Sequence, residues 1–103
     1  MKHFHRTSVG ADTVLEHADD FFRGLGLAET ARSARARTWN GVVGSPEQPA
    51  TVSLTVRMEG GHYTFVEVHT TAQGESRVDR NVKKFFVRIH RLADARHASA
   101  AAY

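Results

Sequence analysis

Cysteine is absent from this chain of 103 residues, so disulfide bonds, thiolate catalysis and cysteine-ligated zinc are excluded. Proline occurs only twice, at Pro46 and Pro49, and both fall in one predicted loop over residues 44–49. No stretch approaches the ~18 apolar residues of a membrane-spanning helix, and residues 1–6 lack the apolar core of a signal peptide. We therefore expect a cytoplasmic protein with no transmembrane segment.

Sequence motifs of the common enzyme classes are also missing. The chain has no GxSxG turn for a nucleophilic serine, no GxxxxGK(S/T) phosphate loop and no GxGxxG dinucleotide motif. Glu67 and His69 lie two residues apart on a predicted strand and come nearest to an acid–base pair, but such neighbours need no catalytic explanation. We predict no catalytic residue, no cofactor and no enzymatic activity.

Histidine is frequent, with seven in the chain. His3 and His5 share one face of a predicted strand, and His69 is the candidate third ligand of a metal site. No carboxylate is spaced to complete the set, and no helical HExxH pair occurs. We therefore predict no metal site.

The composition is that of a globular protein, with 41% hydrophobic and 24% charged residues. The length suits one domain, which we place at residues 1–96. An alanine-rich tail over residues 97–103 is expected to fray.

Hydrophobic periodicity predicts the secondary structure. A helix is expected from Asp12 or Thr13, with a capping box between Thr13 and Glu16, and Gly26 is its expected left-handed cap. A second helix is expected over residues 76–95, and strands over residues 2–9, 32–43, 51–58 and 63–71, the last two joined by a Gly60-Gly61 hairpin turn. This order predicts an α+β two-layer sandwich whose antiparallel four-stranded sheet carries both helices on one face.

Positive charge is concentrated in the second half of the chain. The net charge is +3, and residues 51–103 hold eight basic and five acidic side chains. Five cations of the predicted last helix lie within an arc of about 80°, which suits a nucleic-acid- or anion-binding surface. The alternative is that they balance the acidic side of the first helix. This basic stripe consists of Arg77, Arg80, Lys84, Arg88 and Arg91.

A second candidate surface is the face of the sheet opposite the helices. Its predicted residues interleave basic and aromatic side chains, as single-stranded nucleic acid binding uses. The same residues would also suit an apolar ligand cleft or a homodimer interface. The set comprises Arg35, Arg37, Trp39, Tyr63, Phe65 and His69.

The order of the elements resembles two known families. It is similar to the ribosome-hibernation proteins, which lodge in the decoding region of the small subunit and share a basic final helix. It also resembles a reduced helix-grip domain, the fold of lipid and polyketide binders, in which a long C-terminal helix closes over a curved sheet. The second resemblance implies an apolar ligand pocket, with Trp39, Tyr63 and Phe65 as its candidate lining.

The main functional hypothesis is a small non-enzymatic binding domain that contacts RNA or the ribosome through its basic C-terminal helix. Two alternatives remain. One is a helix-grip-like carrier of an apolar ligand, and the other is a homodimeric structural subunit that pairs through its open sheet face.

Overall fold

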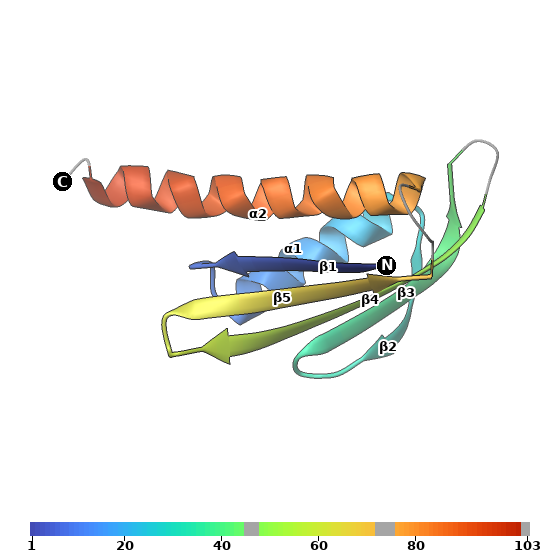
Figure 1. The fold of residues 1–103 in the computed structure, drawn as a ribbon, viewed down its shortest axis with the longest axis horizontal. Helices are drawn as coiled ribbons and strands as arrows, with labels where there is room; N and C mark the ends of the chain where they lie inside the picture. Colours follow the sequence, from blue (N-terminus) through green and yellow to red (C-terminus); the bar gives the residue numbers. More distant parts are fainter. Residues whose placement is uncertain (45–47, 72–75, 102–103) are drawn as a thin grey trace.

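The computed structural model describes residues 1–44, 48–71 and 76–101, with side chains in the last range described up to residue 95. Two helices and a five-stranded antiparallel sheet form two layers (Figure 1). In sheet order the strands are β1, β5, β4, β3 and β2, so that β1 and β2 are the edges. In chain order the elements are β1 (Lys2–Thr7), α1 (Ala11–Gly24), β2 (Ala28–Arg32), β3 (Ala36–Val43), β4 (Gln48–Glu59), β5 (Tyr63–Thr70) and α2 (Arg77–Ala101).

The α+β class and the antiparallel sheet are confirmed, but the prediction of four strands is wrong because the sheet has five. The region predicted as one strand over residues 32–43 belongs to two strands, with β2 ending at Arg32 and β3 beginning at Ala36. All residues of β2 are exposed, so its sequence lacks the apolar alternation that marks a half-buried strand. A register shift between Glu29 and Ala31 further interrupts its pairing with β3.

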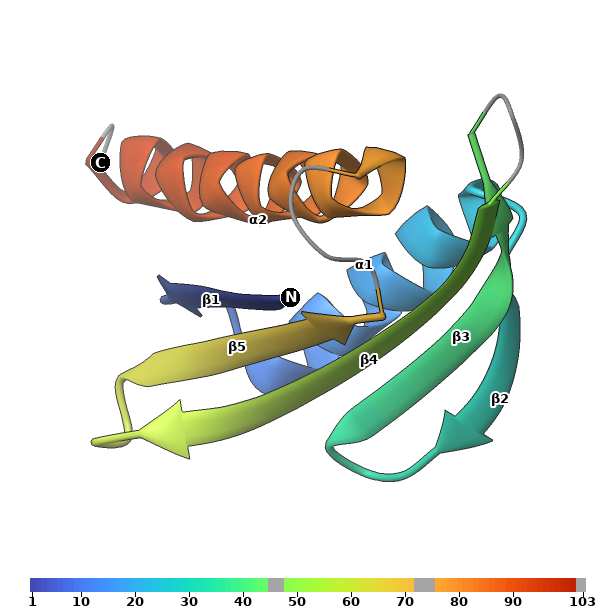
Figure 2. The same ribbon diagram turned by 45° about the vertical axis from the view of Figure 1, so that its right-hand side comes forward.

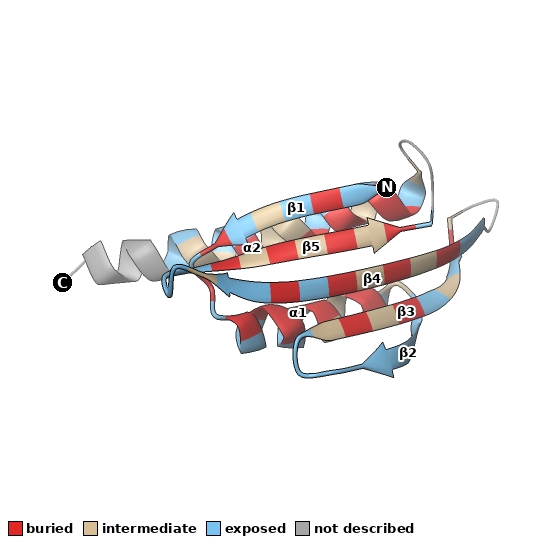
Figure 3. Ribbon diagram, turned by 60° about the horizontal axis from the view of Figure 1, so that its bottom comes forward, coloured by how far each residue is buried: buried red, intermediate tan, exposed pale blue. Residues whose placement is uncertain are grey.

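The hydrophobic core lies between the sheet and the two helices. Buried and more exposed residues alternate along β4 and β5, so that one side of these strands faces the core (Figure 3). Val52, Leu54 and Val56 supply this side of β4, as their alternation predicts. The sheet curves beneath the helices, with α2 running above β1 and β5 (Figure 2). Met58, predicted to join the core side, is exposed near the end of β4.

Helix α1 differs from its prediction at the start and agrees with it at the end. Gly10 is the N-cap and no side chain caps the helix, so the expected capping box between Thr13 and Glu16 is wrong. Gly26 has a φ of 87°, and the Leu27 amide donates a hydrogen bond to the Phe22 carbonyl. These features confirm Gly26 as the left-handed residue that ends the helix.

Helix α2 begins with a capping residue. The Ser76 hydroxyl accepts the Asp79 amide at 3.2 Å and donates to the Asp79 carboxylate at 2.7 Å. The helix continues to Ala101, beyond the expected end at residue 95. Neither α1 nor α2, over the residues that the structure describes, is long and apolar enough to cross a membrane.

Candidate ligand site between the second helix and the first strand

The structure divides the six residues that were predicted to share the open face of the sheet. Tyr63, Phe65 and His69 lie on that face, as predicted. Trp39 is instead 1% exposed on the helix side, where its ring stacks on Phe22 with centroids 4.7 Å apart. The assignment of Trp39 fails because its face is set by pairing with Val52, which also points into the core.

The two arginines of this set also leave the open face. Arg37 is buried beneath α1, where its Nε donates to Asp19 at 3.1 Å. Arg35 is exposed between β2 and β3, and it lines a surface hollow with the first turn of α1. Trp39, Tyr63 and Phe65 therefore do not line one pocket, contrary to the expectation drawn from the helix-grip resemblance.

Four of the five residues in the basic stripe of α2 are exposed, but the fifth, Arg88, is paired with residues of α1. Arg88 reaches across to α1, where its Nη2 lies 3.1 Å from an Asp20 oxygen and its Nε donates to His17 Nδ1 at 3.1 Å. The other four residues, Arg77, Arg80, Lys84 and Arg91, are exposed. Part of the stripe thus balances the acidic side of α1, which was the alternative interpretation.

A buried polar cluster ties the start of α2 to β1 and β5. Asp79 is 1% exposed, and its Oδ1 accepts hydrogen bonds of 2.7 Å from His3 Nε2 and from the Thr70 hydroxyl. Ser76 donates to the other oxygen. Burial by itself would raise the pKa of Asp79, but the hydrogen bonds from His3, Ser76 and Thr70 outweigh it and lower that pKa. The cluster therefore holds an ionised carboxylate with its oxygens paired, which is an anchoring role.

The cluster was not found from the sequence. Ser76 and Asp79 have the spacing of a capping box, which was the available signal. The sequence suggests only a metal-ligand role for His3, together with His5 and His69. His3 and His5 do share the helix side of β1, but His69 lies on the opposite face and bonds to Glu67 at 2.8 Å. Within the described residues, no group of three candidate metal ligands comes together.

The seam between α2 and β1 contains a histidine with an unusual environment. The ring of His5 stacks on Phe86, with centroids 5.0 Å apart and an interplanar angle of 16°. Its Nε2 atom is buried and has no hydrogen-bond partner among the described residues. Burial, with a smaller electrostatic contribution from nearby His90, lowers the pKa of His5 below its ordinary value of 6.5. His5 is thus a neutral, partly buried ring with one unused nitrogen.

This lowered pKa gives a testable pH dependence. Between the folded pKa of His5 and 6.5 the unfolded chain binds more protons, so the stability contributed by neutral His5 falls as the pH drops below 6.5. We expect the unfolding free energy of the wild type to decrease more between pH 7.5 and pH 5.5 than that of His5→Gln. Urea unfolding of both proteins at the two pH values measures the difference, and equal decreases would contradict the assignment.

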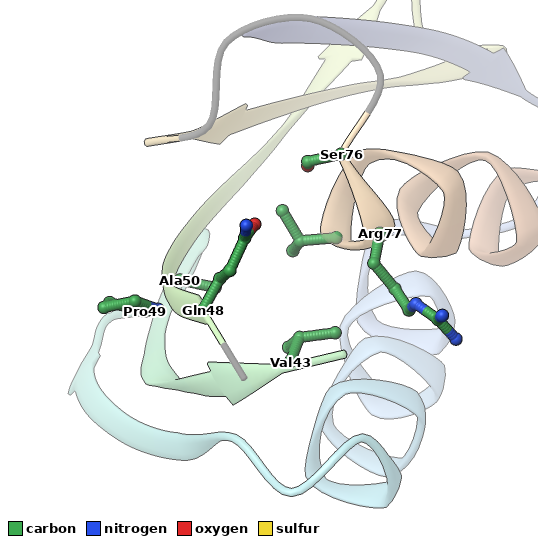
Figure 4. A pocket seen from close by; sticks show the side chains of 7 residues that line it. Val43, Gln48, Pro49, Ala50, Ser76 and Arg77 are labelled. Carbon is green, nitrogen blue, oxygen red and sulfur yellow. The ribbon is translucent and has the colours of Figure 1, made fainter. Parts of the chain in front are cut away.

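The small pocket at the start of α2 has too little room for a ligand. Val43, Ala50 and Val78 lie around a pocket of about 20 Å³ beside Arg77 (Figure 4). That volume holds about one water molecule. Larger hollows of about 340 and 360 Å³ are open, and they lie along the exposed side of α2 and beside the start of α1.

Comparison with known proteins supports a fold but no family. No protein-family model matches the sequence, and no curated protein matches it significantly. Among solved structures, the chain is similar to StfQ, a di-domain ARO/CYC protein from the steffimycin biosynthetic pathway. The TM-score is 0.54 at 13% identity, covering 96% of this chain and 46% of StfQ. The chain therefore spans less than half the length of that protein.

This likeness corrects the main functional hypothesis. The fold is similar to that of an ARO/CYC protein, which is of the helix-grip type. Contact with RNA or the ribosome through α2 is therefore the wrong interpretation, and the basic helix that suggested it is partly engaged with α1. At this sequence identity the comparison establishes the helix-grip-like α+β fold alone.

Proposed function

We propose that this protein binds an apolar small molecule in the seam between α2 and β1. The similarity in fold supports the general location, because a helix-grip fold places its long C-terminal helix over the sheet. Here α2 extends past the end of β1, so that β1 covers only part of its length (Figure 1). Phe86, Leu92 and Ala93 on α2 are only partly buried against the core.

One observation carries the proposal: the Nε2 of His5, which has no hydrogen-bond partner in the described part of the chain, lies beside the half-buried ring of Phe86. Ligand pockets are mostly apolar with a few polar groups that orient the ligand. A buried polar atom without a partner costs about 1–3 kcal/mol, and a ligand that bonds to it removes this cost. The seam therefore suits an apolar molecule that carries one hydrogen-bonding group.

A binding role fits these residues better than catalysis does. The other buried histidine, His3, is committed to Asp79, whose oxygens also accept from Thr70 and Ser76. This arrangement stabilises a fixed carboxylate and leaves it little freedom to transfer protons. His5 has the free nitrogen, but its stacking partner is the apolar ring of Phe86.

The proposal is tested with N-phenyl-1-naphthylamine, a neutral apolar fluorophore that has one N–H donor. We expect its fluorescence to rise on titration with the wild type, with a dissociation constant in the micromolar range. His5→Phe keeps a flat ring against Phe86 but removes the nitrogen, so affinity is expected to fall about 2- to 10-fold, the value of one hydrogen bond. Ala93→Phe adds bulk two helical turns from Phe86 on the same face, and it is expected to weaken binding about tenfold or more.

Val87→Phe is the matched control, because it makes a similar change on the exposed side of the same helix. Val87 lines the open hollow with Lys83, Lys84, Arg88 and Arg91, so this variant also reports any binding there. Binding should be unchanged in the control, and thermal melts confirm that each variant is folded. The proposal is wrong if the wild type does not bind the probe, or if only Val87→Phe weakens binding.

A further inference from the structure

We infer that the open face of the sheet is an interface that pairs with the same face of a second copy of this chain. Both helices lie on the other side of the sheet, so this face is uncovered within one copy (Figure 3). It nevertheless carries large aromatic side chains, since Phe4 is 53% and Tyr63 51% exposed. Exposed aromatic clusters on a sheet are typical of partner surfaces.

The aromatic residues of this face form an ordered group rather than scattered side chains. The rings of Phe4 and Phe65 stack with centroids 5.6 Å apart. The guanidinium groups of Arg57 and Arg6 lie 4.5 and 5.7 Å from the centre of the Phe65 ring. The Glu59 carboxylate forms salt bridges with both arginines, at 2.7 Å from Arg6 and 3.6 Å from Arg57. These side chains are thus already oriented before a partner arrives, which lowers the entropic cost of association.

The charges of the face alternate between neighbouring rows. Strand pairing places Arg6 and Arg57 on either side of Phe65 in one row. The next row, two residues along the strands, contains Phe4, Glu67 and Thr55. Suppose that two copies pack face to face around a two-fold axis that lies in the interface, perpendicular to the strands and midway between these two rows. The arginine row of each copy then lies opposite the glutamate row of the other. The face is therefore complementary in charge to itself.

The exposed side of α2 lacks this property. Its stripe residues Arg77, Arg80, Lys84 and Arg91 are all positive, so two copies of that surface would repel each other. On the open sheet face, in contrast, the positive charges of Lys2, Arg6 and Arg57 are nearly balanced by the negative charges of Glu59 and Glu67.

The centre of the open sheet face also has room for a partner. Here β4 presents only the short side chains of Thr51, Ser53 and Thr55, which leave space for the aromatic rings of a second copy. The sheet face is thus the surface that a second copy fits.

The size of the face sets the expected strength of the interaction. Five strands about 4.8 Å apart and about 20 Å long present about 500 Å² per copy. The total buried area of about 1,000 Å² is at the lower end for a specific interface. We therefore expect a reversible dimer with a dissociation constant in the micromolar range.

Sedimentation velocity of the full chain between about 1 and 300 μM tests this inference, since a micromolar constant places the transition in that range. The mass should rise from 11.4 kDa toward twice that value. Glu67→Arg and Arg57→Glu each place like charges opposite one another, and each should remain monomeric. When the two variants are mixed, every introduced charge meets an opposite one, so a heterodimer should form.

Arg80→Glu is the control for charge reversal elsewhere, because Arg80 is exposed on α2, and it should dimerise like the wild type. Thermal melts establish that every variant is folded. A wild type that stays monomeric at 300 μM would overturn the inference. So would charge variants that dimerise normally, or a mixture that fails to associate. None of these outcomes bears on ligand binding at His5, which lies on the opposite side of the sheet.

Discussion

Phe22→Ala is expected to lower the free energy of unfolding by about 3–5 kcal/mol, the cost of removing a fully buried phenylalanine. Phe22 is 0% exposed, and its ring lies 4.7 Å from that of Trp39 and 5.4 Å from that of Phe85. Phe22 therefore connects α1 to β3 through Trp39 and to α2 through Phe85. A domain of this size has about 5–15 kcal/mol in total, so the variant should be close to unfolding at room temperature. Urea midpoints measure the loss.

Phe86→Ala serves as the comparison for this first prediction. The ring of Phe86 is only partly buried, beside His5, so its truncation should cost about 1–2 kcal/mol. The sequence alone predicts equal losses for the two positions, because both lie on apolar helical stripes. A Phe86→Ala variant as unstable as Phe22→Ala would show that the seam is a closed part of the core, which would count against the proposed ligand site.

Asp79→Ala is expected to have a similarly large effect, about 3–5 kcal/mol, because it leaves several hydrogen-bond donors of a buried cluster without their shared acceptor. Asp79 accepts hydrogen bonds from His3, Thr70 and Ser76, and these would lose their acceptor in a buried environment. The variant would also loosen the attachment of α2 to β1 and β5. Urea unfolding at pH 7 measures the loss of stability.

Asp94→Ala is the matched control for Asp79→Ala on the same helix. Asp94 is exposed and pairs with His90 one turn away, so its removal should change stability by no more than about 0.5 kcal/mol. Because the pKa of Asp79 is lowered, its stabilising contribution is present above its ordinary value of 3.8 and is lost as the pH falls below it. Asp79→Asn should therefore show a smaller loss of stability than the wild type between pH 4 and pH 2. Equal acid sensitivity, or equal losses in Asp79→Ala and Asp94→Ala, would contradict this role.

Local sequence patterns were sufficient to predict the helices and strands that bury one face and expose the other. Residues 51–58 alternate because β4 has one side in the core, and Gly60 and Gly61 have the positive φ angles that the hairpin turn requires. The apolar stripe of α1 likewise corresponds to its buried residues. In contrast, β2 buries no residue, so its sequence carried no periodic signal. The strand count therefore depended on pairing that the sequence did not reveal.

The candidate sites depended still more on tertiary structure. Alternation predicts that Tyr63 and Phe65 lie on one face of their own strand, and this is confirmed. It does not predict which face of β3 meets the helices, since that depends on the register of Trp39 with Val52 on the next strand.

The sequence by itself determined the α+β class, the apolar stripes and the residues that face outward on β5. Tertiary structure decided the fifth strand, the burial of Trp39 and Arg37, and the meeting of His3 with Asp79, which are 76 residues apart. It also placed His5 against Phe86, with a nitrogen that no described residue pairs. The physical reason is that periodicity reports the burial of a residue within its own helix or strand. A hydrogen bond or a ring stack requires a second element, whose position only the assembled fold provides.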